Sequence, residues 1–192
     1  MLCEKEMVQK RCFYEWSCRV PLIMRFPDGW KAGTVCDTPV SLIDLLPTFC
    51  QLANTQASLP HDGESLISNI DGQHADRHIF AQAHEAVGVP CIMTRHGRYK
   101  YNYIHDYDDQ LFDLNADPGE WNNLVNDPAH QETATRLRGL TLDRFNPERM
   151  AEENLASLYR RRLIRDSMTK HGQTWTHFPE YDARKGASDQ YF

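Results

Sequence analysis

The sequence predicts a mixed α/β fold, in which the end of an α/β domain is followed by a smaller α+β subdomain. An apolar run bounded by a turn lies near the N-terminus, and aromatic and β-branched residues fill the middle of the chain. Apolar residues then recur at helical spacing toward the C-terminus. We therefore expect residues 1–75 to complete the α/β domain. Residues 76–192 should form the subdomain, with a helical hairpin and an aromatic tail.

The first predicted element is a buried strand over residues 20–24, which read VPLIM. The run ends at a Pro-Asp-Gly turn over residues 27–29, which is typical of a strand boundary. A buried strand needs neighbours on both sides, so we expect the domain to be truncated at its N-terminus. A helix should follow over residues 44–54, because Asp44 is a favourable capping residue. A shorter helix is expected over residues 65–69.

The middle of the chain predicts a small antiparallel sheet, because its apolar and aromatic residues are bounded by turn residues. The expected strands cover residues 77–84, 89–96, 99–104 and 111–113. Two helices should follow, since Asp127 and Asn146 each precede a proline, a combination that favours a helix start. The last twenty residues read as an irregular tail rich in aromatic side chains.

Composition and charge exclude several classes of partner. The chain has 192 residues, a formal net charge of −6 and a hydrophobic fraction of 41%. The negative charge argues against a nucleic-acid partner, and we interpret the basic run at residues 160–162 as the solvated face of a helix. No stretch approaches the roughly 20 apolar residues that span a bilayer, and the N-terminus lacks the apolar core of a signal peptide.

The six cysteines are scattered, and none forms a C-x-x-C pair. A chain of this length does not need disulfides to hold its core, so we expect free thiols and a cytoplasmic location.

Four segments, taken in order, resemble the sulfatase family. They are residues 10–23 (KRCFYEWSCRVPLI), 44–48 (DLLPT), 62–66 (DGESL) and 111–124 (LFDLNADPGEWNNL). Four ordered matches are far more specific than any one of them. The resemblance implies the C-terminal part of an alkaline-phosphatase-like sulfatase fold.

Two further segments resemble the choline-sulfatase subgroup. They are residues 89–101 (VPCIMTRHGRYKY) and residues 160–164 (RRRLI) with the Trp- and Pro-containing tail that follows. The resemblance implies hydrolysis of a small-molecule sulfate ester, with choline sulfate favoured, by a homo-oligomer when the protein is full length. An arylsulfatase or phosphonate monoester hydrolase fragment remains an alternative. A non-catalytic oligomerisation or binding module is the alternative of another class.

The resemblance also implies a formylglycine nucleophile, made from the cysteine of a C-x-P-x-R motif, and a divalent cation, with Ca²⁺ favoured. Only Cys91 and Arg95 have the matching separation, and Met93 occupies the proline position. We therefore interpret Cys91 as structural. The family's metal ligands also precede the matched segments. The chain alone is thus expected to bind neither cofactor and to be inactive.

Lys10 is the one catalytic residue that the resemblance places in this chain, as a cation on the sulfate oxygens. The alternative is a solvated loop lysine. A choline-like substrate would need a carboxylate and an aromatic face, for which Glu85, Trp175 and Asp182 are the candidates. The alternative is that the aromatic side chains of the tail only anchor it to its own subunit or to a neighbouring one.

Two pairs of polar residues have plain structural interpretations. Arg19 is expected to pair with Glu15 or a neighbouring carboxylate. His74 and His78 are four residues apart, a spacing that zinc ligands on a helix can have. Since no third ligand is nearby, we expect a surface loop and no metal site.

Overall fold

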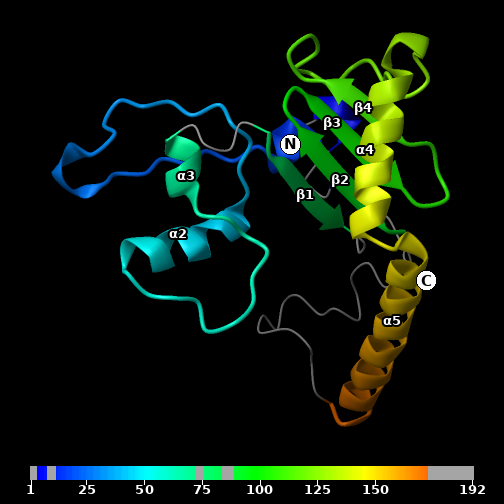
Figure 1. Cartoon of the computed structure of the whole chain (residues 1–192). Helices are drawn as coiled ribbons and strands as arrows, with labels where there is room; N and C mark the ends of the chain where they lie inside the picture. Colours follow the sequence, from blue (N-terminus) through cyan, green and yellow to red (C-terminus); the bar gives the residue numbers. More distant parts are fainter. Residues whose placement is uncertain (1–3, 8–11, 72–75, 84–88, 173–192) are drawn as a thin grey trace.

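A computed structural model describes residues 4–7, 12–71, 76–83 and 89–172, and the structural statements below concern this part of the chain (Figure 1). It has the α/β class that the sequence predicts, with helices around one antiparallel sheet of four strands in the order β1-β2-β3-β4. The strands are β1 (His78–Ala83), β2 (Cys91–His96), β3 (Tyr99–Ile104) and β4 (Gln110–Asp113). All four predicted strands are therefore confirmed, with ends that shift by at most two residues.

The hairpin between β2 and β3 turns at Gly97, whose φ of 54° lies in the left-handed region that favours glycine. The register pairs His96 with Tyr99 and Cys91 with Ile104. Since side chains alternate between the two faces of a strand, this register decides which residues meet on each face.

Helix α4 (Gln131–Arg144) covers one face of the sheet, as Figure 1 shows. Thr94 and Thr141 connect β2 to α4 through a buried hydrogen bond of 2.7 Å between their hydroxyl oxygens. The apolar core lies between these two layers. Its buried members are Ile92, Tyr101, Tyr103, Leu111, Ala134 and Leu137.

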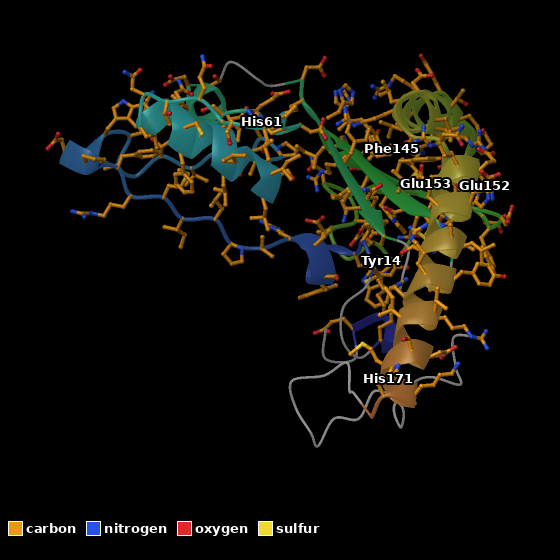
Figure 2. The ribbon with its side chains drawn as sticks, turned by 90° about the horizontal axis from the view of Figure 1, so that it is seen from below. Tyr14, His61, Phe145, Glu152, Glu153 and His171 are labelled. Atoms are coloured by element: carbon orange, nitrogen blue, oxygen red, sulfur yellow. The ribbon has the colours of Figure 1, made fainter. Side chains whose placement is uncertain are left out.

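The N-terminal segment covers the opposite face. It contains a 3₁₀ turn, η1 (Glu4–Glu6), and a short helix, α1 (Glu15–Cys18). Tyr14 packs on Phe112 of β4, with ring centroids 6.1 Å apart. Figure 2 shows Tyr14 on the other side of the strands from α4, whereas Phe145 lies on the α4 side.

Residues 20–71 form a separate lobe beside the sheet (Figure 1). Its elements are η2 (Pro27–Gly29), η3 (Leu42–Asp44), α2 (Leu45–Leu52) and α3 (Leu66–Ile70). Ser41 and Asp44 form a reciprocal capping box around η3, and the Ser65 hydroxyl accepts a hydrogen bond of 3.3 Å from the backbone N–H of Ile67 in α3. Both predicted helices of this region are confirmed.

The predicted buried strand over residues 20–24 is wrong. These residues have no strand assignment, and Ile23 is 92% exposed. A strand requires partners for its backbone N–H and C=O groups. In the described part of the chain, the sheet consists of β1 to β4 and does not include this segment.

Both predicted helix starts near the C-terminus are confirmed. The Asp127 carboxylate accepts a hydrogen bond of 2.9 Å from the Ala129 N–H at the start of η4 (Pro128–His130). The Asn146 side chain accepts one of 2.8 Å from the Arg149 N–H at the start of α5 (Pro147–Lys170). Figure 1 shows α5 projecting away from the sheet. Arg160 and Arg162 are exposed on it, as expected for a solvated face.

The described cysteines, Cys12, Cys18, Cys36, Cys50 and Cys91, are all free, as the sequence predicts. Within the described ranges, no helix combines the length and the apolar character that a membrane span needs.

Leu137→Ala should lower the free energy of unfolding by about 2–5 kcal/mol, because the side chain is fully buried between α4 and the sheet. The matched control is Leu163→Ala on α5, where the side chain is 71% exposed and truncation should change stability by less than about 0.5 kcal/mol. Urea unfolding of the two variants measures both values. Equal losses would contradict the assignment of the core.

Candidate functional site

All four predicted site residues, Lys10, Glu85, Trp175 and Asp182, lie outside the described residues. Their roles therefore stay predictions. The structure does describe residues 12–19, the segment after Lys10, and the side chains that hold this segment on the sheet. The candidate site is built from these contacts.

Lys100 is the centre of these contacts. It lies on β3 and is almost fully buried. Its Nζ donates to the Phe13 carbonyl oxygen at 2.8 Å and forms ion pairs with Glu15 Oε1 at 2.5 Å and Glu120 Oε1 at 2.9 Å. One ammonium group thus joins three segments that are far apart in the sequence.

Glu15 lies between two cations. Besides Lys100, it pairs with Arg95 of β2, with Arg95 Nη1 and Glu15 Oε1 3.4 Å apart. The ion pairs described for Glu15 are thus with Arg95 and Lys100, whereas Arg19, which was predicted to pair with Glu15 or a neighbouring carboxylate, is exposed. Both Arg95 and Lys100 reach Glu15 because they are register partners on β2 and β3 and so lie side by side on the sheet.

Glu120 completes the cluster from the loop after β4. Its Oε2 accepts a hydrogen bond of 2.6 Å from the Glu15 backbone N–H, and its backbone carbonyl accepts one from Lys5 Nζ. The Lys5 ammonium also lies 3.6 Å from the centroid of the Trp121 ring. Glu120 has a φ of 56°, which is uncommon for a residue other than glycine. The buried ion pair holds this backbone conformation in place.

This cluster of Lys100, Glu15, Glu120 and Arg95 is balanced in charge. Each carboxylate contacts a cation, so the desolvation cost is offset by attraction and by the hydrogen bonds. Burial raises the pKa of the neighbouring Cys18 thiol, although Lys100 opposes the shift. Cys18 is therefore a protonated thiol at neutral pH. The cluster positions the N-terminal segment and offers no nucleophile.

Cys91 is buried at the start of β2, as its interpretation as structural requires. Burial raises the pKa of its thiol, which keeps it protonated and unreactive at neutral pH.

A second buried ion pair joins Asp44, the last residue of η3, to Arg77 just before β1. Arg77 Nη1 and Nη2 donate to the two carboxylate oxygens of Asp44 at 2.7 and 2.6 Å. The same carboxylate accepts hydrogen bonds from the backbone N–H of Ser41 at 2.7 Å and of Glu64 at 3.0 Å. Burial by itself would raise the pKa of Asp44, but Arg77 and these backbone donors lower it overall.

Gly63 lies in the DGESL segment, at a position where the chain has no room for a side chain. A Cβ atom at this position would overlap the backbone carbonyl oxygen of Ile43. The close approach brings the Glu64 N–H to Asp44 and the Leu66 N–H to the Thr48 hydroxyl, which accepts at 2.8 Å. The DLLPT and DGESL segments are therefore two sides of one buried network.

The residues of the fourth family-like segment stabilise the loop after β4. The Asp113 carboxylate pairs with Arg98 and accepts from the backbone N–H of Asn115 at 3.1 Å. The Asn123 side-chain oxygen accepts from the backbone N–H of Leu111 at 2.9 Å and of Val125 at 3.1 Å. This segment thus folds back on β4 and places Glu120 under Lys100.

The prediction that His78 belongs to a surface loop is wrong, since His78 lies in β1 and is half-buried, whereas His74 lies outside the described residues. Its ring stacks on His96, with centroids 4.3 Å apart. Burial, together with the charge of His96, lowers the pKa of His78. Among the residues that the structure describes, no group of three or more His, Cys, Asp or Glu side chains is placed to hold a metal ion. These residues do not fit the divalent cation that the resemblance implies.

The sequence analysis missed the buried charges Lys100, Glu120 and Arg77. Lys100 alternates with tyrosines in β3, and both faces of that strand are covered. A lysine between aromatic residues in a strand buried on both sides was the available signal, because such a lysine must have a carboxylate partner.

The comparisons with known proteins agree with these motifs. The family model described as N-sulphoglucosamine sulphohydrolase, C-terminal, matches residues 3–147. The chain is 32% identical over 187 residues to a choline-sulfatase of Rhizobium meliloti, covering 93% of this chain and 36% of that protein. It is 31% identical over 140 residues to a delta 4,5-hexuronate-2-O-sulfatase of Bacteroides thetaiotaomicron, covering 68% of this chain and 29% of that protein.

Among solved structures, a 2-O GAG sulfatase is similar at 30% sequence identity and a TM-score of 0.46, over 59% of this chain and 26% of that one. The chain spans about a third of the length of the curated relatives that it matches.

Acid should destabilise the wild-type chain partly through Asp44. Folding lowers the pKa of the Asp44 carboxyl group. Its contribution to stability is therefore complete above about pH 3.9, the usual pKa of an unfolded aspartate. This contribution is lost as the pH falls through the lower pKa of the folded state. Asp44→Asn should therefore be less stable than the wild type at pH 7 and should lose less stability on acidification.

Urea unfolding at pH 7 and at pH values below 4 measures this difference. Asp62→Asn is the control, because the Asp62 side chain is 79% exposed, so that solvent weakens its ion pair with Arg144 and the substitution should leave the pH dependence close to that of the wild type. An Asp44→Asn variant with the full wild-type acid dependence would disprove the role of the Asp44–Arg77 pair.

Proposed function

The chain belongs to the sulfatase family, and from this premise we propose that it is the C-terminal part of a sulfuric ester hydrolase that acts on choline sulfate. Hydrolysis would release choline and sulfate. The observation that carries the family assignment is the match of the C-terminal family model to residues 3–147, which is most of the chain.

The extent of the choline-sulfatase match supports the choice of substrate. The family model ends at residue 147, whereas this relative matches 93% of the chain. The unmatched 7% of 192 residues is about 13 residues, so the match must include most of residues 148–192. The hexuronate sulfatase matches only 68% of the chain. The C-terminal region therefore favours a choline-sulfatase over other sulfatases.

In this proposal, Lys10 places its ammonium group on the sulfate oxygens. Negative charge develops on the sulfuryl oxygens and on the leaving group during hydrolysis, and a preorganised cation stabilises that charge. The Lys100 cluster supports the role, because it fixes Phe13 and Glu15 within a few residues of Lys10. A fixed backbone limits the positions that Lys10 can reach.

Glu85, Trp175 and Asp182 would bind the quaternary ammonium of choline in the same proposal. A cation without N–H donors is recognised by aromatic faces and by negative charge, which these three side chains supply.

The nucleophile and the divalent cation would come from sequence outside this chain. None of its six cysteines lies in a C-x-P-x-R motif, and the described residues contain no cluster that fits a metal. Formylglycine and the cation would supply the attack on sulfur in the complete enzyme. By itself, this chain would be inactive.

We also place the complete protein in the cytoplasm as a homo-oligomer. The five described cysteines are free, as suits a reducing compartment. Helix α5 exposes Leu155, Tyr159 and Leu163 at four-residue spacing, which is an apolar stripe suited to a contact between subunits.

A chimeric polypeptide tests the proposal. The part of the Rhizobium meliloti choline-sulfatase that lies outside its match would be joined to this chain and assayed for sulfate release from choline sulfate and from an aryl sulfate. We expect release from choline sulfate by the chimera and none by the chain alone. Preference for the aryl sulfate would instead support an arylsulfatase, and activity on neither ester would contradict the hydrolase assignment.

Lys10→Ala in this chimera should lower kcat/KM by about 10²–10³, the usual loss for removing a group that stabilises transition-state charge. Lys10→Arg should restore part of the activity, because it keeps the positive charge. Lys5→Ala is the matched control, since Lys5 contacts Trp121 and the Glu120 carbonyl and has no proposed role on the sulfate. Equal losses in the two alanine variants would exclude the specific role of Lys10.

A further inference from the structure

Strand β1 has a strand partner on one side only. It is an edge strand of the sheet, it pairs with β2, and its other edge faces the lobe of residues 20–71 (Figure 1). Among the described residues, no strand pairs with this second edge. The unpaired N–H and C=O groups along such an edge are a template for a further strand.

A cleft of about 750 Å³ lies between this edge and the lobe. Residues 76–82 form one wall, and the other wall comes from the lobe through Ser41, Ile43, Asp62 and Glu64. The ion pair of Arg77 with Asp44 ties the two walls together. Ligand pockets in proteins commonly measure about 300–1,000 Å³. Both walls belong to this chain, so the cleft is built by its own fold.

Three carboxylates line the cleft among the described residues. They belong to Asp62, Glu64 and Asp76, and each of these side chains is more than half exposed. The hydrogen bond with His96 lowers the pKa of Asp76. Asp76 therefore stays ionised at neutral pH, and the cleft presents negative charge on both walls.

The positive groups in the cleft do not balance this charge. Arg77 donates to both carboxylate oxygens of Asp44, which lies outside the lining, so its charge is already neutralised. Burial lowers the pKa of His78, which is therefore uncharged at neutral pH. The remaining cation is Arg144, which faces three carboxylates. Charge complementarity favours a cationic partner.

Arg144 itself shows how the cleft holds a cation. Its guanidinium carbon lies 5.0 Å from the centroid of the Phe80 ring and 5.8 Å from that of Phe145, and its Nη2 lies 3.4 Å from Asp62 Oδ1. The two rings meet edge to face, with centroids 5.7 Å apart. Two aromatic rings and a carboxylate attract a cation more strongly than either does alone. We refer to Phe80, Phe145 and Asp62 as the cation cage.

The cation cage adjoins the free edge, because Phe80 is a residue of β1. A strand added to that edge would therefore bring its side chains past the cage. In strand addition, the main-chain hydrogen bonds supply affinity, and the sites for alternate side chains supply specificity.

We propose that this cleft is a docking site for an extended cationic peptide segment of a partner protein, which adds as a strand to the free edge of β1 and places a cationic side chain in the cation cage in exchange for Arg144. The inference goes beyond the proposed function, since it uses neither Lys10 nor the residues assigned to choline.

A binding titration with the full 192-residue chain tests the inference. The probe is a capped, fluorescent peptide of six residues, the length of β1, in which arginine and valine alternate. We expect saturable binding that weakens as the salt concentration rises, because the contacts are ionic and exposed. A peptide of alternating glutamate and valine should not bind. No saturable binding of the arginine peptide would overturn the inference.

Charge reversal in the cleft should weaken binding. Asp62→Lys and Glu64→Lys should each lower the affinity about three- to tenfold, since each removes an attraction and adds a repulsion. Glu132→Lys is the matched control, because Glu132 is exposed at the far end of α4 from Arg144 and should leave binding unchanged. Far-UV circular dichroism confirms that the variants fold. Equal losses in all three variants would refute the docking site.

Removal of Arg144 should have the opposite effect. Arg144→Gln vacates the cation cage, so the affinity should rise about two- to fivefold, the value of an exposed cation–π contact. Arg138→Gln is the control, because Arg138 is an exposed arginine of α4 that lies outside the cleft. Weaker binding by Arg144→Gln would show that the peptide does not take its place and would overturn the exchange.

Modified peptides test strand addition without any change in the protein. One carries N-methyl groups on its arginine amides and the other on its valine amides, so that each loses the donors along one edge. One of the two should lose at least about tenfold in affinity, because its edge is the one that pairs with β1. Equal binding of both, or self-association of the chain that Asp62→Lys abolishes, would contradict a peptide strand as the occupant.

Discussion

Burial of the Lys100 ammonium group constrains much of the structure around it, because a charge removed from water requires partners of opposite charge. Glu15 and Glu120 supply them from two segments that are distant in the sequence, and the Phe13 carbonyl adds a hydrogen bond. The side chain therefore fixes residues 13–15 against the sheet and sets the conformation of the loop that carries Glu120. If Lys10 acts on sulfate as proposed, it does so from the end of this anchored segment.

The Asp44–Arg77 pair follows the same physical rule in the lobe beside the sheet. Its carboxylate joins η3, the Gly63-Glu64 segment and the start of β1 through two ion-pair contacts and two backbone hydrogen bonds. The residues that make the sequence resemble sulfatases are therefore largely structural. They bring separate segments together at buried charges.

Periodicity and capping residues predicted the local elements, because strand alternation and the Asp127 and Asn146 caps act over a few residues. The partners of Lys100 and Arg77 were not predictable in this way, since burial of a charge depends on tertiary contacts. The prediction of a strand over residues 20–24 is wrong for a related reason, because a strand requires a neighbouring strand that the described part of the chain does not provide. The proposed sulfate and choline roles come from the family resemblance.

A double-mutant cycle between Glu15 and Lys100 tests most directly whether this ion pair holds the N-terminal segment on the sheet. The free energy of unfolding would be measured for the wild type, Glu15→Gln, Lys100→Met and the double variant. A buried, hydrogen-bonded pair predicts a coupling energy of about 1–3 kcal/mol. A coupling energy near zero would contradict the account, because the two side chains would then stabilise the fold independently.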